Sequence, residues 1–452
     1  MKTRKMLALV LAGAMTAGMA AGCSSGNSGN TGGQTNAGNE AGAETTKQAQ
    51  DSSSQGSAGG SGEVVEITFP SMWVGVNTFK EWFDNRMEVF NAEYGDSIKV
   101  NIEEIAGDQN YVDKIKVLYS SDSLPDAFCT GGYNLIDTMQ DKLVDLTPHI
   151  DDEWKKMGSD VTWEVNSRDG KIYGIPYARQ AIGYFYNKEL FAKAGIEKPA
   201  ETWDEFFEQC DKLLAAGITP LSMDTADSGW VTSLMLGAMI GQTDEGEEFM
   251  NTNLPKDYNT PEFIEAAANI QRMFQNYTTS DAVGGAYENA AGNFFTEETA
   301  IIANGPWMVS DFYDTNMVEE GFADKIGTAM YPGGVMYNSG KIGFNIGSKD
   351  EKTLEATLTF VKFLTNEESQ KLMLEMTGDI PAADGITSDK TAPLVNEVIE
   401  NAGKASHSIN DFQSLWYANV VDEISIQYPL LAQGEITPEQ FAQALTDAAA
   451  KN

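Results

Sequence analysis

The region of residues 63–452 alternates strand-like and helix-like segments, and this alternation constrains the fold more than any other feature. Apolar residues recur at helical spacing between short β-rich runs. These runs lie at residues 64–69, 97–105, 126–130, 181–186, 299–303, 325–331 and 341–346. Strands that alternate with helices predict an α/β body with mainly parallel sheets. About 390 residues exceed one ordinary hydrophobic core, so we expect two lobes.

Cap signatures predict where several helices begin. Thr78 with Glu81 forms a capping box before an apolar helical face. Thr202 precedes a second helix whose apolar face includes Cys210. Thr437, followed by a proline, predicts the start of the last helix.

The amino-terminal residues 1–22 have the three-part pattern of a secretory signal peptide: basic residues, an apolar run, and small residues. The apolar run is too short for a stable membrane span. The four residues ending at Cys23 resemble the lipobox of bacterial lipoproteins, although Ala20 stands where that motif usually has leucine. The resemblance implies cleavage before Cys23 and a diacylglycerol on its sulfur, which is the predicted lipid anchor. The alternative is ordinary signal cleavage that leaves Cys23 as a chance thiol.

Residues 24–62 consist of small and polar residues with a few charges and contain no aromatic residue. Such a composition cannot bury enough apolar surface to offset chain entropy, so we expect disorder. Residues 23–62 are therefore predicted to be a lipidated cysteine followed by a tether. Stable anchoring needs two or three acyl chains, because one chain binds a membrane only marginally.

The net charge of −37, from 67 acidic and 30 basic residues, argues against nucleic acid as a partner. Beyond Cys23 the chain has only Cys129 and Cys210, which do not make a disulfide framework. Cys210 falls on the core face of its helix, which predicts a buried, inert thiol. Whether Cys129 and Cys210 pair stays open.

No catalytic motif is visible. The only histidines, His149 and His407, lie outside zinc-binding motifs, and there is no G-x-S-x-G elbow, P-loop or strand-linked G-x-G-x-x-G. No calcium loop is present either. Pairs among 67 acidic residues carry almost no specificity for glycoside hydrolysis. The sequence gives no positive evidence for an enzyme, a metal or a cofactor.

Four tryptophans follow strand or turn signals: Trp73, Trp230, Trp307 and Trp416. Ligands of open α/β folds collect at the carboxyl ends of strands, so aromatic residues there can face a cleft. The C–H face of a pyranose stacks on such rings, while polar side chains pair with its hydroxyls. The alternative for each tryptophan is an ordinary place in the core.

Several segments together resemble the family 1 extracellular solute-binding proteins. The most specific are DGKIYGIPY at residues 169–177 and GYFYNKELF at residues 183–191, which resemble the crossover between the lobes. Further matches lie at residues 124–128, 202–206, 294–307, 378–381 and 433–439. They span nearly the whole body in order.

The resemblance implies a periplasmic-binding-protein fold, type II-like and similar to maltose-binding protein. Each lobe would be a mainly parallel sheet flanked by helices. Lobe 1 is expected to comprise residues 63–180 and 336–388, and lobe 2 residues 181–335 and 389–452. Such a receptor captures a sugar between its lobes and delivers it to the permease of an ABC importer.

The resemblance also suggests ligand-binding residues. Trp307, in a Gly-Pro-Trp turn, is expected to stack a sugar ring, and Trp416 and Trp230 to supply further aromatic platforms. In lobe 1, Trp73 and Asn77 occupy the loop after the first strand.

Five further residues, glycines and polar residues, complete this expected site. Thr130, Gly131 and Gly132 follow a strand after which relatives often carry polar or charged residues that contact the sugar. The absence of such side chains here could leave room for a larger ligand such as an oligosaccharide. Arg179 or Gln180 lies where the family places a hydroxyl-binding residue.

Asp281, Tyr331 and Tyr337 are weaker candidates, more typical of surface or packing.

The implied mechanism is hinge closure, with motion absorbed near residues 178–183, 332–341 and 384–389. We expect a monomer without cofactor, lipid-anchored on the extracellular face of the membrane of a Gram-positive cell. Two alternatives stay open. One is an importer receptor for a peptide, polyamine or metal chelate, and the other is a surface enzyme that degrades polysaccharide.

Overall fold

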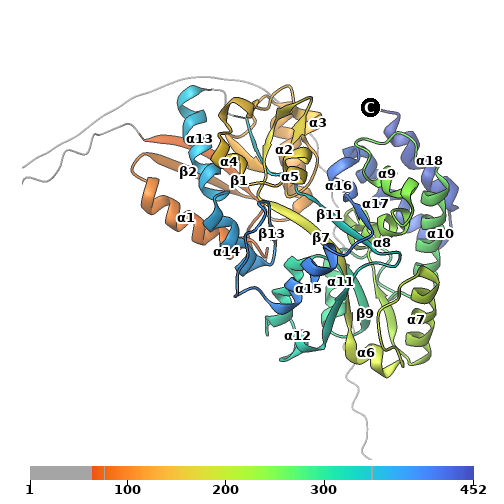
Figure 1. Cartoon of the computed structure of the whole chain (residues 1–452). Helices are drawn as coiled ribbons and strands as arrows, with labels where there is room; N and C mark the ends of the chain where they lie inside the picture. Colours follow the sequence, from red (N-terminus) through yellow and green to blue (C-terminus); the bar gives the residue numbers. More distant parts are fainter. Residues whose placement is uncertain (1–63, 76, 348–349) are drawn as a thin grey trace, which may run out of the picture. The chain divides into compact units, whose positions relative to one another are not determined.

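The computed structural model describes residues 64–75, 77–347 and 350–452 (Figure 1). The predicted signal peptide, the lipid anchor at Cys23 and the tether lie outside these residues. Within the described ranges, no helix has the length and apolar character needed to cross a lipid bilayer.

Two separate hydrophobic cores define two lobes. One core takes residues between Ile67 and Ala178 and between Ile342 and Met373, and we call this part lobe 1. The other takes residues between Ala181 and Tyr337 and between Leu374 and Ala449, and we call it lobe 2. The prediction of a two-lobed α/β protein is confirmed. The chain passes from one core to the other near the predicted lobe boundaries at 180/181 and 335/336. The third passage comes after Met373, before the predicted boundary at 388/389, so the exact lobe limits stay a prediction.

Lobe 1 is built mainly from the first third of the body and two later helices. Its elements are β1 (Val65–Ser71), α1 (Lys80–Tyr94), β2 (Ile98–Glu104), α2 (Asp108–Ser120), β3 (Ala127–Cys129), α3 (Ile136–Met139), η1 (Thr147–His149), α4 (Asp152–Lys155), α5 (Asp160–Val165), β4 (Ser167–Arg168), β5 (Lys171–Ile172), β6 (Gly174–Ile175), β12 (Phe344–Ile346), α13 (Glu351–Leu364) and α14 (Glu367–Thr377).

Lobe 2 follows the long strand β7 (Ala178–Asn187). Its further elements are α6 (Lys188–Lys193), α7 (Trp203–Ala215), β8 (Thr219–Ser222), η2 (Asp227–Gly229), α8 (Trp230–Ile240), α9 (Asp244–Met250), α10 (Pro261–Asn276), α11 (Tyr287–Phe295), β9 (Thr299–Asn304), η3 (Pro306–Val309), η4 (Asp311–Tyr313), α12 (Phe322–Lys325), β10 (Ile326–Ala329), β11 (Val335–Gly340), β13 (Ile380–Pro381), α15 (Pro393–Ala402), β14 (His407–Ile409), α16 (Phe412–Leu415), α17 (Ala418–Gln433) and α18 (Pro438–Ala449).

The expectation of mainly parallel sheets is wrong. Among the described strands, β1 with β2, β8 with β9, and β11 with β14 are parallel. Strand β7 pairs antiparallel with β9, β10, β11 and β13, and β12 pairs antiparallel with β3 and β6. For β11 the reason is that β7 carries the chain from lobe 1 into lobe 2. The strand that returns beside it to lobe 1 must run the opposite way.

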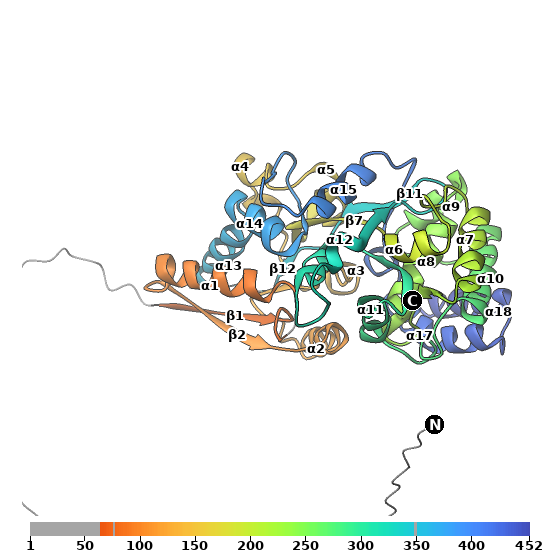
Figure 2. The ribbon, with the colours of Figure 1, turned by 90° about the horizontal axis from the view of Figure 1, so that it is seen from below.

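Strands β7, β11 and β13 lie side by side where the chain passes between the lobes. Arg179 of β7 pairs with Gly340 of β11 and with Ile380 of β13. In Figure 2, β7 and β11 lie between the β1–β2 side of the body and the helices α7, α8 and α10. The third crossover was expected at residues 384–389, but the strand beside β7 is β13, a few residues earlier.

Two of the three predicted helix starts are confirmed. The Thr202 hydroxyl accepts a hydrogen bond from the Glu205 N–H at the start of α7, and Thr437 forms a full capping box with Gln440 at α18. The capping box at Thr78 is wrong. Helix α1 begins at Lys80, so Phe79 and not Thr78 occupies the N-cap position, and no side-chain cap forms. The Asn77 side-chain oxygen accepts the Phe79 N–H at 3.0 Å in the turn before the helix.

The structure answers the question about the two cysteines. Cys129 lies in the core of lobe 1 and Cys210 in that of lobe 2, and both are free and buried. Burial raises the pKa of the Cys129 thiol to about 12, and it raises the pKa of Cys210 as well. Both are therefore inert thiols, as expected for Cys210.

Candidate functional site

Three aromatic side chains of lobe 2 meet beside the crossing strands. Trp307 follows β9 in η3, Trp230 begins α8 after β8, and Tyr287 begins α11. Because β8 and β9 are parallel neighbours, their carboxyl ends share one edge of the sheet, where ligands of α/β folds bind. The Trp230 ring centroid lies 6.0 Å from that of Trp307 and 5.9 Å from that of Tyr287.

These three rings, which we call the aromatic trio, are only partly buried. Asn304 orients one of them: its side-chain amide donates to the Tyr287 hydroxyl at 3.0 Å, and its side-chain oxygen accepts the Gly305 N–H at 2.8 Å in the turn before Trp307. The trio therefore offers partly exposed, oriented ring surface of the kind that a sugar face or another apolar surface can stack on.

A buried ion pair lies against the trio. The Lys341 ammonium is 2.5 Å from the Asp379 carboxylate and 4.4 Å from the Trp307 ring centroid. Lys341 is only 6% exposed and Asp379 is fully buried. Burial raises the pKa of Asp379, and the charge of Lys341 opposes that shift. Lys341 follows β11 directly, so the pair holds one face of Trp307 against the crossing strands.

Two acidic side chains from opposite lobes complete the surroundings. Asp108 begins α2 of lobe 1 and is reached by solvent, yet the surrounding protein raises its pKa. Lys341 opposes this shift and Glu288 of lobe 2 adds to it. The Asp108 carboxylate is accessible and interacts electrostatically with Glu288 of the other lobe. It is therefore placed to accept hydrogen bonds from a ligand held between the lobes.

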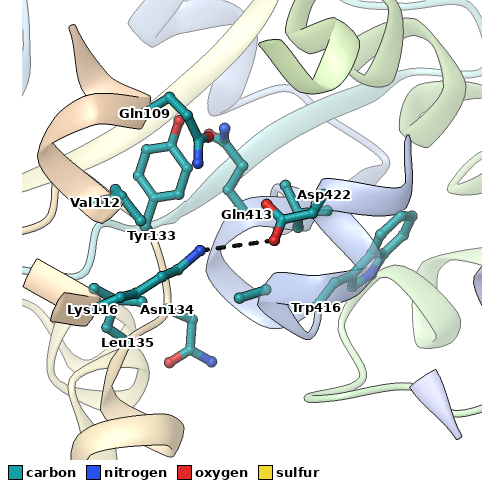
Figure 3. A pocket seen from close by; sticks show the side chains of 11 residues that line it. Gln109, Val112, Lys116, Tyr133, Asn134, Leu135, Gln413, Trp416 and Asp422 are labelled. Atoms are coloured by element: carbon teal, nitrogen blue, oxygen red, sulfur yellow. Dashed lines mark ion pairs between the residues drawn. The ribbon is translucent and has the colours of Figure 1, made fainter. Parts of the chain in front are cut away.

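A small pocket lies between the lobes beside α2 and α17 (Figure 3). Its lining combines lobe 1 and lobe 2: Gln109, Val112, Lys116, Tyr133, Asn134, Leu135, Gln413, Trp416, Ala418, Val421 and Asp422. The Lys116 ammonium is 3.9 Å from the Asp422 carboxylate across it. Its volume of about 20 Å³ leaves room for about one water molecule, so the lobes are in contact here.

Trp416 borders this pocket from the core of lobe 2. It is 2% exposed and packs against Tyr258 and Phe263, with ring centroids at 5.0 and 6.2 Å. Its indole N–H is buried without a hydrogen-bond partner among the described residues. The ring is therefore part of the core of lobe 2 and has no open stacking face.

The Thr130-Gly131-Gly132 turn meets lobe 2. The Ser414 hydroxyl donates to the Gly132 carbonyl at 3.1 Å, and the Asn134 N–H donates to the Gln413 carbonyl at 3.0 Å. Gly131 has φ +65°, and a Cβ there would lie 2.3 Å from the Met72 methyl. The bare glycines are thus required by the turn and its close packing. Thr130 is buried, and its hydroxyl donates to the Tyr133 carbonyl.

The two polar crossover residues serve different neighbours. Arg179 donates to the Pro381 carbonyl at 3.1 Å and pairs with Asp384 at 3.1 Å, so it joins β7 to β13 and the loop that follows. Gln180 is buried, accepts from the Ser339 hydroxyl, and lowers the pKa of Asp411 by hydrogen bonding, although burial raises that pKa overall.

Trp73 and Asn77 contact residues of lobe 1. Trp73 is 3% exposed inside the aromatic core of lobe 1, stacked on Phe79 at 5.4 Å and edge-on to Phe83 at 5.3 Å. Its faces are covered, so it supports the lobe instead of offering a platform. Asn77 uses its carbonyl oxygen to order the turn before α1.

The weaker candidates fall on packing and surface positions. Tyr331 and Tyr337 are buried in lobe 2, where the Tyr337 hydroxyl donates to the Leu234 carbonyl at 2.8 Å. Asp281 is exposed and accepts from Asn293.

Sequence reasoning missed Tyr287, Lys341, Asp379 and Asp108. Asp379 lies in the family-like segment 378–381 and Lys341 in the expected crossover 332–341, but neither was singled out as a site residue. The others depend on contacts between residues far apart in the chain.

Asp224 contacts the start of α8, the helix that carries Trp230 of the aromatic trio. It is fully buried, and its carboxylate accepts the Thr232 N–H at 3.1 Å in the first turn of α8, the helix that begins with Trp230. Burial raises its pKa from 3.8 to about 7. Between about pH 4 and 7 the folded protein thus holds a proton that the unfolded chain has released, and stability falls as pH rises through this window.

Asp224→Asn keeps a carbonyl acceptor and should remove this part of the pH dependence. We expect the urea midpoint of the natural protein to fall more between pH 5 and 8 than that of the variant. The exposed Asp96→Asn is the control, and Asp311, whose pKa burial raises to about 6, contributes equally to all three proteins. Parallel pH profiles for Asp224→Asn and the natural protein would contradict the assignment.

Two α/β lobes, joined by crossing strands and with aromatic and polar side chains beside the junction, define a two-lobed ligand-binding protein. Residues 85–397 match the family described as bacterial extracellular solute-binding protein, and the chain belongs to that family. The predicted resemblance is therefore confirmed.

Relatives and solved structures agree with this assignment. The multiple sugar-binding protein of Streptococcus mutans serotype c is 26% identical over 239 residues, which cover 50% of this chain and 54% of that protein. An sn-glycerol-3-phosphate-binding periplasmic protein of Brucella melitensis biotype 1 is 24% identical over 224 residues, covering 47% and 49%. The chain thus matches about half the length of these relatives. A solved chitin oligosaccharide binding protein has a TM-score of 0.75 at 22% identity, covering 86% of this chain and 99% of that one.

Proposed function

We propose that this protein is the sugar-binding receptor of an ABC importer and holds an oligosaccharide between its lobes. The observation that carries the proposal is the aromatic trio, partly exposed at the carboxyl ends of β8 and β9 and next to the crossing strands. Relatives named for sugars and sugar oligomers support it. Trp307 and Trp230 would stack the sugar, and Asp108 would accept hydrogen bonds from its hydroxyls.

The charges favour a neutral sugar over a phosphorylated ligand. Asp108 and Glu288 approach from the two lobes, and the buried Lys341 is already neutralised by Asp379. Among the described residues around the trio, a phosphate would meet these two acidic groups and a lysine already paired with Asp379, which is costly between the lobes. The name of the Brucella relative makes glycerol 3-phosphate the appropriate competitor to test.

A thermal-shift screen tests the ligand class. Mono- and oligosaccharides should raise the melting temperature, glycerol 3-phosphate should not, and product analysis should recover the sugar unchanged. A shift with glycerol 3-phosphate alone would overturn the sugar assignment while leaving the receptor role. Release of shorter sugars would instead identify a surface enzyme.

Hinge closure is proposed as the response to sugar. Contacts across the lobes, such as Ser414 to Gly132, would stabilise a closed form that sugar favours. Small-angle scattering should show a smaller radius of gyration with saturating sugar than without it. An unchanged radius despite proven binding would rule out closure for this protein.

We also propose delivery to a permease from a lipid anchor at Cys23 on the extracellular face of a Gram-positive membrane. The tether composition and the lipobox-like residues before Cys23 support this. Mass spectrometry of the mature amino terminus should find a diacylated cysteine. A free amino-terminal thiol would show ordinary signal cleavage.

A further inference from the structure

A second cluster of ionisable side chains lies on lobe 2 among residues that form no part of the aromatic trio. Asp244 and Glu247 belong to the short helix α9, and His407 begins β14. Each offers a ligand atom, and these atoms all lie within 4.8 Å of one another. Helix and strand are 160 residues apart in the chain at the Glu247–His407 contact, so only the fold brings the three together.

We propose that Asp244, Glu247 and His407 bind a divalent transition-metal ion of the Zn²⁺ type. One imidazole nitrogen and two carboxylate oxygens suit zinc, whereas calcium and magnesium prefer oxygen ligands alone. Three protein ligands leave a fourth position for water. This site is independent of the proposed sugar function.

The geometry is close to that of a metal site. The His407 Nδ1 atom is 2.7 Å from a Glu247 carboxylate oxygen, which is a hydrogen-bond distance. Two ligands at about 2.0 Å from a tetrahedral ion are roughly 3.3 Å apart, so the ion would replace the shared hydrogen with a shift of about half an ångström.

Hydrogen bonds orient the Glu247 carboxylate, whereas Asp244 lies at the surface. The other Glu247 oxygen accepts the Ser408 N–H at 2.9 Å, which orients the carboxylate. His407 and Glu247 are partly buried, and Asp244 is exposed in the first turn of α9. The positive end of a helix opposes a cation, so two carboxylates are needed here, and the net charge of −37 favours cation approach.

A bound ion would join α9 to β14. Strand β14 leads into residues 411–416, where Ser414 and Gln413 contact lobe 1. The ion would therefore stabilise the base of the segment on which the lobes meet.

The test is titration of the whole mature protein with zinc chloride after chelator treatment. Isothermal calorimetry should give one site, with a rise in melting temperature, and Co²⁺ should give a visible absorption band typical of nitrogen and oxygen ligands. His407→Ala should weaken zinc affinity at least roughly tenfold. The other histidine, His149, is exposed in η1 of lobe 1, and His149→Ala should leave the affinity unchanged.

Asp244→Asn provides a second variant, because this exposed side chain can be changed without opening the core. It should also weaken zinc binding while circular dichroism shows an unchanged fold. Absence of heat, or equal affinity in the natural protein, His407→Ala and Asp244→Asn, would overturn the proposal. Loss of zinc binding with His149→Ala alone would place the ion elsewhere.

Discussion

Trp307→Ala should weaken binding of the sugar found in the screen roughly 10- to 100-fold, or about 1.4–2.8 kcal/mol. Trp307 is the member of the trio that touches both Trp230 and the buried Lys341. Removing it would take away a stacking surface and the contact that orients its neighbour. Isothermal calorimetry with the same sugar measures the loss.

The matched control is Tyr313→Ala, an aromatic residue of the same lobe that is 56% exposed in η4. It should bind sugar as the natural protein does. Circular dichroism and the melting temperature must show that Trp307→Ala is folded. Full affinity in a folded Trp307→Ala variant would refute the placement of the site.

Lys341→Met should lower the free energy of unfolding by about 3–5 kcal/mol, because it leaves the Asp379 carboxylate buried without its partner. Asp379 would then take up a proton more readily, so the loss should shrink as pH falls. Urea unfolding followed by tryptophan fluorescence at pH 5 and 8 measures both effects.

Two comparisons isolate the buried charge. Lys390→Met breaks the pair between the exposed Lys390 and the partly buried Glu375, and it should cost less than about 1 kcal/mol because the lysine stays in water. Adding Asp379→Asn to Lys341→Met removes the unpaired charge and should recover part of the stability. A loss for Lys341→Met no larger than that for Lys390→Met would mean that solvent, not the pair, compensates Asp379.

Local sequence predicted the parts of the structure that depend on neighbouring residues. The caps at Thr202 and Thr437 are determined within three residues of each helix start, and both were predicted correctly. The Thr78 prediction failed although its pattern was equally good, because helix α1 begins one residue later and places Phe79 at the N-cap position. A local pattern predicts a possible helix cap, and the residue at which the helix begins determines whether that cap forms.

The candidate site was predicted only in part. Trp230 and Trp307 follow strands, and the structure brings them together with Tyr287. Trp73 has the same sequence signal but lies in the aromatic core of lobe 1. A position after a strand does not determine whether a ring faces the core or the solvent. That depends on which other helices and strands of the same lobe cover the ring.

The sequence by itself determined the alternation of strands and helices, the presence of two lobes, and the family to which the chain belongs, because these depend on periodicity, length and motifs of consecutive residues. The tertiary structure decided the antiparallel pairing around β7, the Lys341–Asp379 pair and the cluster at His407. Each of these joins residues from about 40 to about 200 positions apart, so only folding brings the partners together.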